Sequence, residues 1–163
     1  MKIRTQDLAL IALFIALCTV STMLIRIPLP TSGYANLGDA IVLLAGWILG
    51  PIYGALAAGL GTALADLIGY PIYAPATFII KFAVAFFASK LISRYESLSF
   101  VHLCVIGLMC ELIMLVGYYI YDAILLGNIL SPALNLPGNI MQAVIGTLVA
   151  AFLYRHLSRF IKK

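Results

Sequence analysis

The chain has 163 residues, of which 64% are hydrophobic and only 10% charged, and its mean hydropathy is +1.11. A soluble domain of this size does not carry so much apolar surface, because much of a water-facing exterior is polar. The composition therefore excludes an ordinary soluble fold and predicts an integral membrane protein. The net charge of +4 is not gathered on one basic face, so nucleic-acid binding is not indicated.

Six apolar stretches follow one another along the chain, and they predict an all-α, six-helix transmembrane bundle that forms one domain over residues 1–163. Most reach the roughly 20 residues that a helix needs to cross about 30 Å of hydrocarbon. The second rises only about 20 Å, so we expect it to be tilted, partly submerged or shielded by its neighbours. The stretches are 7–27, 37–49, 52–69, 74–93, 100–126 and 134–157.

Lys and Arg residues in the short connections predict the orientation of the bundle. They precede the first stretch, follow the fourth and end the sixth, which puts them on one side of the membrane if there are six crossings. Both termini are therefore expected to be cytoplasmic, in a multi-pass protein of the cell membrane. The opposite connections lack both residue types, although Arg26 lies at the outer edge of the first stretch. The basic residues are Lys2, Arg4, Lys90, Arg94, Arg155, Arg159, Lys162 and Lys163.

The first stretch begins like a secretory signal, with basic residues before an apolar run. It lacks a clear small-residue cleavage site, so we expect it to be retained as a helix. Ala9, Ala12 and Ala16 lie on one stripe of this helix. Small residues let helix backbones approach closely, and such a stripe suits either another helix of the same chain or a separate protein. A second small-residue face, with Gly54, Ala58 and Thr62, is expected to pack within the bundle.

Motifs for catalysis and metal binding are missing from the sequence. There is no GxxxxGK[ST], HExxH or GxSxG pattern, and the three cysteines have no CxxC spacing. The chain is therefore expected to be no enzyme and to hold no cofactor or metal. If it transports a solute, the energy would come from an ion gradient or from a partner.

Polar residues within the apolar stretches carry the functional signal. Glu111, Tyr118 and Asp122 recur at a spacing that places them within about 40° of one line on a helix. Lys81 is the notable charge, because a lysine near the bilayer centre costs about 2.5 to 3.5 kcal/mol. We expect these groups to wall a pocket toward the outer side. The other members are Thr77 beside Lys81, and Asn135, Asn139 and Gln142 on one face of the last stretch.

Two alternatives remain open for these polar groups. Lys81 pairs with Glu111 or Asp122 in a purely structural interpretation, in which amides bridge helices. Asp39 and Asp66 are expected near the aqueous edge, where water or a helix N-terminus satisfies them. Tyr34 and Asn36 belong to a Gly-containing connection suited to a lid over a flat ligand. Tyr70, Tyr73, Tyr119 and Tyr121 fit either the pocket or an interfacial aromatic belt.

The segment YANLGDAIVLLAGWILGPIYGALAAGLGTALADLIGY, followed by YAPATFIIK, resembles the S components of energy-coupling factor (ECF) vitamin transporters. The resemblance covers most of the chain, and NLGD and APATFIIK are its most specific parts. It implies a subunit that captures a vitamin or precursor outside, while a coupling membrane subunit and two ATPase subunits drive release inside. It also implies that Ala12 and Ala16 contact the coupling subunit. The pocket it implies matches Tyr34, Asn36, Lys81, Glu111, Tyr118, Asn139 and Gln142 in location.

The chemistry of these side chains narrows the ligand to a small, flat molecule with several hydrogen-bonding groups. An aminopyrimidine suits a carboxylate, and a pyridoxine-like ring offers a phenolate to Lys81. The resembling subfamily favours hydroxymethylpyrimidine, with vitamin B6 next, whereas riboflavin or folate would need a larger, more aromatic cavity. The rival function is a self-sufficient proton-coupled transporter with Glu111 and Asp122 as its relay.

Overall fold

The computed structural model describes residues 4–95 and 98–161, with side chains described as far as residue 157. Lys2, Lys162 and Lys163, which entered the prediction of orientation, lie outside the described residues, as does the side chain of Arg159.

Six α-helices make up most of the described residues, and each overlaps one of the predicted stretches. Five are long and apolar enough to cross a membrane, and α2 is a shorter apolar helix. The helices are α1 (Thr5–Leu24), α2 (Gly38–Leu49), α3 (Pro51–Gly69), α4 (Ala74–Ile92), α5 (Phe100–Leu126) and α6 (Leu136–Ile161).

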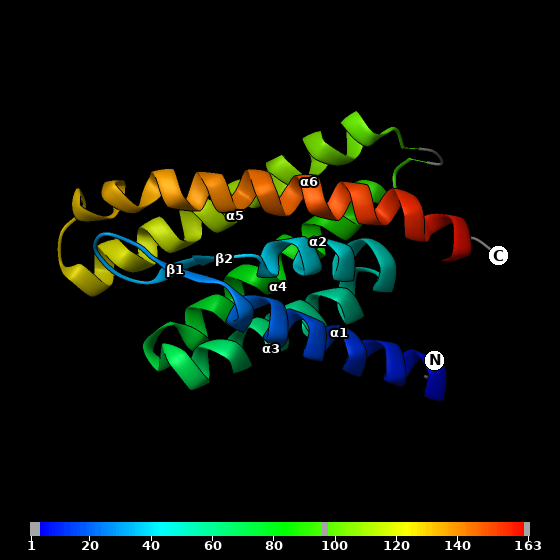
Figure 1. Ribbon diagram of the computed structural model, residues 1–163, viewed down its shortest axis with the longest axis horizontal. Helices are drawn as coiled ribbons and strands as arrows, with labels where there is room; N and C mark the ends of the chain where they lie inside the picture. The colour runs from blue at the N-terminus through cyan, green and yellow to red at the C-terminus, as the bar shows by residue number, and fades with distance from the viewer. Residues whose placement is uncertain (1–3, 96–97, 162–163) are drawn as a thin grey trace.

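The short helix α2 lies in the middle of the bundle. In Figure 1, α2 and α4 run between the pair α1 and α3 on one side and the pair α5 and α6 on the other. Its residues contact α1, α3, α4 and α6, and 9 of the 12 are buried. Of the three expectations for the second stretch, shielding by neighbouring helices is confirmed.

Close contact between α2 and α3 depends on small residues. Gly54, Ala58 and Thr62 are buried along one face of α3, as their spacing predicts. A Cβ atom on Gly54 would lie 2.3 Å from the carbonyl oxygen of Ala45 on α2, a distance at which the two backbones would have to separate. Glycine at this position therefore sets how closely the helices pack.

The connection after α1 forms a β-hairpin, which the sequence analysis did not predict. Strands β1 (Arg26–Pro28) and β2 (Tyr34–Asn36) pair antiparallel, with Ile27 opposite Ala35. Gly33, just before β2, has a φ of +72°, a backbone conformation that side chains with a Cβ rarely adopt. The strands are three residues long each, too short for an alternating pattern to stand out in the sequence.

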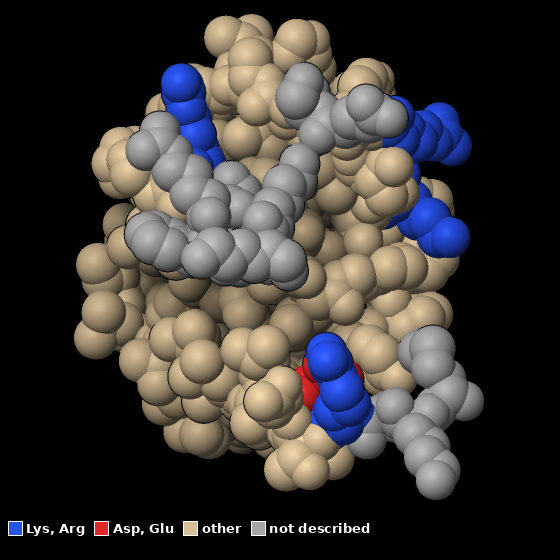
Figure 2. All heavy atoms as spheres, turned by 90° about the vertical axis from the view of Figure 1, so that its right-hand side faces the viewer, with Lys and Arg blue, Asp and Glu red and all other residues tan. Residues whose placement is uncertain are grey.

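The two ends of the bundle differ in what they carry. Figure 1 places both termini at one end and the hairpin at the other, with the 3₁₀ helices η1 (Pro71–Tyr73) and η2 (Ser131–Asn135) also toward the hairpin end. Figure 2 faces the end with the termini, and Lys and Arg side chains project around it. Among the described residues, Arg4, Lys90, Arg94 and Arg155 are exposed. This distribution agrees with the charge pattern behind the predicted orientation, in which the hairpin end faces outward.

Candidate functional site

A pocket lies at the hairpin end, between the hairpin and the helices beneath it. The hairpin and its turn cover it, and its walls come from α1, α3, η1, α4, α5 and α6. Its lining residues are Thr22, Leu29, Ser32, Gly33, Tyr34, Asn36, Thr62, Asp66, Tyr73, Thr77, Lys81, Tyr118, Asp122, Asn139 and Gln142.

The free space in this pocket is small. The volume open to water is about 30 Å³, which is room for roughly two water molecules. Pockets that hold drug-sized molecules are far larger, roughly 300 to 1,000 Å³. As it stands in this structure, the pocket is too small for a ring-sized solute.

The deepest contact of the pocket is an ion pair between Lys81 and Asp39. Lys81 donates to one carboxylate oxygen of Asp39, and the other oxygen accepts a 2.5 Å bond from Nε2 of Gln142. The Gln142 carbonyl oxygen in turn accepts from the backbone N–H of Asn36 in β2, at 2.7 Å. A single amide thus connects the buried ion pair to the hairpin.

This ion pair corrects two sequence-based expectations. Lys81 pairs with Asp39 and not with Glu111 or Asp122. Asp39 is fully buried, with no exposed surface, so it does not lie at the aqueous edge. The reason is that the hairpin folds over the start of α2 and excludes water from it.

A second carboxylate, Asp66 of α3, joins the hairpin to α4. One oxygen accepts from the Tyr34 hydroxyl and the other from the Thr77 hydroxyl at 2.5 Å. The Tyr118 hydroxyl lies 2.9 Å from that of Thr77, which continues the chain of hydrogen bonds to α5. Asp66 is 3% exposed, so the expectation that it lies at the aqueous edge is also wrong.

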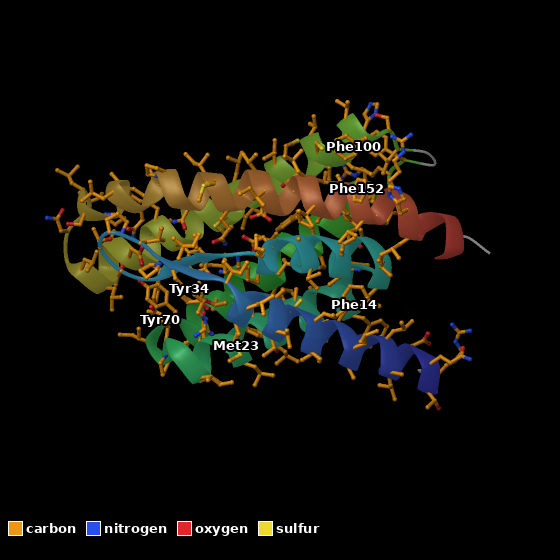
Figure 3. The ribbon with its side chains drawn as sticks, in the orientation of Figure 1. Phe14, Met23, Tyr34, Tyr70, Phe100 and Phe152 are labelled. Atoms are coloured by element: carbon orange, nitrogen blue, oxygen red, sulfur yellow. The ribbon has the colours of Figure 1, made fainter. Side chains whose placement is uncertain are left out.

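Tyr34 sits at the mouth of the pocket in an aromatic contact. Figure 3 shows Tyr34 and Tyr70 together at the hairpin end, and their ring centroids are 4.7 Å apart. The Arg26 guanidinium carbon lies 4.8 Å from the Tyr34 ring centroid, and Nη2 donates to the Ala65 carbonyl at 2.8 Å. Burial, and then the hydrogen bond to Asp66, raise the pKa of Tyr34, so its hydroxyl stays protonated and remains a donor.

The third carboxylate, Asp122 of α5, ties η1 and η2 to the turn of the hairpin. Its oxygens accept from the Tyr73 hydroxyl at 2.6 Å and from the Asn135 amide at 3.0 Å. The same amide donates to the Ser32 carbonyl at 3.1 Å, and its oxygen accepts from the Thr31 N–H at 3.2 Å. Asp39, Asp66 and Asp122 therefore each have both oxygens occupied by donors of the protein.

Hydrogen-bonding capacity remains on other side chains of the pocket. Lys81 has three N–H donors and uses one on Asp39; its Nζ also lies 5.3 Å from the Tyr118 ring centroid. Asn139 is 6% exposed and lines the pocket, and its amide bonds to no other described residue. A solute here would meet the ammonium group of Lys81 and the amide of Asn139, together with the remaining lone pairs of Asp66 and Asp122.

Most of the residues selected from the sequence come together in this pocket. Glu111 is the exception: it is completely buried on α5, lies outside the lining, and both its oxygens lack a hydrogen-bond partner among the described residues. The pocket contains seven selected residues: Tyr34, Asn36, Lys81, Tyr118, Asp122, Asn139 and Gln142.

The sequence analysis missed Thr22 and Ser32, which line the pocket and gave no signal in an apolar helix and a polar loop. Asp66, Tyr73 and Thr77 were noticed but were not included among the binding residues. In the described part of the chain, no three His, Cys, Asp or Glu side chains are grouped so that they could hold a metal ion.

The alanine stripe of α1 lies away from the pocket, on the exterior. Ala9, Ala12 and Ala16 are all exposed, and only 17% of the most apolar window of α1 is buried. The opposite face of the helix, with Phe14, Cys18 and Thr22, is buried. None of the described helices therefore covers the stripe.

Comparisons with known proteins agree with this architecture. Residues 2–159 match the family model described as ECF-type riboflavin transporter, S component. A solved structure described as the S component of a bacterial ECF transporter superposes with a TM-score of 0.75 at 21% identity, over 97% of this chain and 98% of that one. A protein of Pyrococcus woesei, described as uncharacterized and in the gap 3′ region, is 53% identical over 64 residues. That alignment spans 39% of this chain and 43% of the relative.

Fold and pocket together define a membrane protein of the S-component class, whose members are substrate-binding subunits of transport systems. The family match extends over nearly the whole length, and the chain belongs to the family of ECF-type riboflavin transporter S components.

Proposed function

We propose that this chain captures a small, flat, water-soluble vitamin or vitamin precursor at the hairpin end and presents it for ATP-driven uptake by partner subunits in the cell membrane. One observation carries the proposal: an enclosed polar pocket inside an apolar bundle, with a buried lysine and an unpaired amide on its wall. Such groups are costly in a membrane and persist where they serve a ligand or pathway.

The hydrogen-bonding groups of the pocket suit a ligand with both donors and acceptors. Each oxygen of Asp66 and Asp122 accepts one bond from the protein and keeps a second lone-pair site for an amine on the ligand. A ring oxygen or nitrogen can accept from Lys81 or Asn139. The aminopyrimidine of hydroxymethylpyrimidine and a pyridoxine-like phenolate therefore both find partners in this pocket.

Riboflavin is the second candidate, and the description of the matched family favours it. Its ring system offers several carbonyl and nitrogen acceptors to the same donors. It needs far more room than the closed pocket provides, so its binding requires a larger displacement of the hairpin than a single ring does. Size and acceptor content therefore rank single-ring vitamins first and riboflavin second.

The energy for uptake is proposed to come from an ECF coupling subunit and two ATPase subunits, which contact the exposed stripe of Ala9, Ala12 and Ala16. This chain carries no ATPase motif, and no described helix covers those alanines. The rival proton-coupled mechanism receives less support, because Glu111 lies outside the pocket wall and Asp122 is held by Tyr73 and Asn135.

Purification of the chain in detergent tests the proposal in two stages. Mass spectrometry of any copurified molecule identifies the ligand, and titration with pyridoxine, hydroxymethylpyrimidine and riboflavin ranks the candidates. Asn139→Leu is the diagnostic variant: it removes an amide that bonds to no other described residue, so it should abolish binding and leave the thermal midpoint unchanged.

Reconstitution in liposomes then separates the two mechanisms. We expect the chain alone to bind its vitamin but not to accumulate it, with or without a pH gradient. Gradient-driven uptake by the chain alone would establish the self-sufficient transporter, and absence of binding to every vitamin tested would remove the proposed function.

A further inference from the structure

Two hydroxyl groups in the pocket wall have no hydrogen-bond partner among the described residues. They belong to Thr22, near the end of α1, and Ser32, in the turn of the hairpin. Thr22 is 2% exposed, and the hydroxyl oxygen of Ser32 is likewise buried. An unpaired buried hydroxyl is unfavourable, because it has lost its bonds to water and gained none from the protein.

The main chains of both residues are nevertheless held in place. The Thr22 carbonyl accepts from Nε of Arg26 at 3.4 Å, and the Ser32 carbonyl accepts from the Asn135 amide at 3.1 Å. Thr22 is also confined by Gly38, where a Cβ atom would lie 2.2 Å from its hydroxyl oxygen. The backbone bonds therefore hold these residues in place, and the Thr22 hydroxyl adds no hydrogen bond of its own to the fold.

Other threonines of the same wall behave differently. The Thr62 hydroxyl donates to the Ala58 carbonyl at 2.7 Å within its own helix, and the Thr77 hydroxyl donates to Asp66 at 2.5 Å. Among the described residues, the hydroxyls of Thr31 and Thr147 also lack a partner, but neither residue lines the pocket. Within the pocket lining, the unpaired hydroxyls are those of Thr22, at the end of α1, and Ser32, in the cover.

We infer that the hydroxyls of Thr22 and Ser32 are specificity-determining groups that bond directly to the captured solute. The inference rests on the proposed function and adds two contacts to it. A hydroxyl both donates and accepts, so this side of the pocket suits a solute group that does the same, such as a ring hydroxymethyl or an imide. Lys81 and Asn139 then bind the acceptors on the other parts of the molecule.

Two variants test the inference in the full chain, with pyridoxine, hydroxymethylpyrimidine and riboflavin as probes. Thr22→Val and Ser32→Ala remove the hydroxyls at nearly constant shape, and each should weaken the Kd of the probe that wild type binds by about five- to tenfold. Thr22→Ser keeps the hydroxyl and should restore binding to within about twofold. Thr19→Val is the matched control on the same helix, because the Thr19 hydroxyl bonds to the Ile15 and Gly61 carbonyls outside the pocket.

The thermal midpoint of the protein without added vitamin is a second readout. Thr22→Val should not lower it, because no hydrogen bond within the protein is lost, and a small rise is expected. Thr19→Val should lower it, because the hydrogen bonds of the Thr19 hydroxyl to two carbonyls are lost. A structural role for Thr22 predicts the reverse: a lower midpoint for Thr22→Val with its affinity intact.

The outcomes separate this inference from the proposed function. If wild type binds a probe and both hydroxyl variants bind it equally well, only the inference is overturned. If wild type binds none of the three probes, the vitamin-binding function fails and the inference fails with it. Weakened binding by both variants, with unchanged or raised midpoints and rescue by Thr22→Ser, supports it.

Discussion

The pocket at the hairpin end and the outer face of α1 differ in the kind of side chains that they carry. The pocket buries charged and amide groups, and protein donors occupy both oxygens of Asp39, Asp66 and Asp122. The face of α1 exposes small apolar side chains and carries none of that network. Under the proposed function, a solute would be selected by the polar groups of the pocket, whereas a partner helix would be selected by shape.

This contrast predicts that binding and delivery can be disrupted separately. A change to the bonded network of Asp39, Asp66 and Asp122 should alter stability and affinity together, because the same bonds hold the fold and shape the site. A change on the face of α1 should leave both unaltered and affect only the encounter with a partner. The following predictions test that separation.

A bulky residue on the alanine stripe should have the largest effect, a loss of vitamin uptake. Ala12→Trp should abolish vitamin uptake by the complete complex, because the larger ring prevents close helix approach. Affinity of the isolated chain should remain within about twofold. Leu10→Trp is the control, since Leu10 is 44% exposed on the same helix but off the stripe. Equal loss from both variants would contradict a specific role of the stripe, and lost binding by Ala12→Trp would contradict the separation itself.

Removal of the buried cation should cause the next largest effect. Lys81→Met leaves Asp39 charged and without its cation, and breaking a buried ion pair in this way costs about 3 to 5 kcal/mol. We expect a clearly lower thermal midpoint and no detectable binding of pyridoxine. The double variant Lys81→Met, Asp39→Asn removes both charges and should recover most of the stability but not the affinity. An unchanged midpoint for the single variant would show that the pair does not support the fold.

The Tyr34 contact should have an intermediate effect. Tyr34→Phe removes a donor from Asp66. Buried hydrogen bonds to charged groups contribute about 1.5 to 3 kcal/mol. Because Tyr34 is only partly buried, we expect an effect at the lower end of this range, about a tenfold loss of affinity. Its raised pKa means that the contribution is complete below the ordinary value of about 10 and is lost only at higher pH. Titration of binding between pH 7 and 10 should therefore reveal no step from Tyr34, and a step that Tyr34→Phe removes would refute this.

Neutral replacement of Glu111 should have the smallest effect. Glu111→Gln keeps the shape of a side chain that bonds to no described residue and does not line the pocket. Stability should change by less than about 1 kcal/mol, with the vitamin affinity and ATP-driven uptake preserved. A tenfold fall in uptake with unchanged binding would instead indicate the proton relay of the rival mechanism.

Periodicity and hydropathy predicted the helices well, because six apolar helices leave clear apolar stretches in the sequence. The shared polar faces of α5 and α6 were also predictable: Glu111 and Asp122 are buried together on α5, and Asn135, Asn139 and Gln142 on α6. These features depend on spacing within one helix, which a single sequence contains.

Contacts between elements could not be predicted in the same way. Lys81 and Asp39 are 42 residues apart, and their pairing depends on α2 lying beside α4 under a hairpin only three residues per strand. In the sequence, Thr22 is an ordinary residue of an apolar helix. Only the positions of its neighbours show that its hydroxyl has no partner among the described residues. The sequence therefore indicated which residues were unusual, but not which of them satisfied one another.

The side-chain amide of Gln142 links the floor of the pocket to its cover. Its nitrogen donates to Asp39, and its oxygen accepts from the backbone N–H of Asn36 in β2. Lifting the hairpin breaks the outer bond and lets the side chain rotate, which weakens its hold on the carboxylate that neutralises Lys81. Under the proposed function, entry of a solute and loosening of the contact between Asp39 and Lys81 would then occur together. The lysine would be released from its partner as an incoming oxygen or nitrogen atom arrives to accept from it.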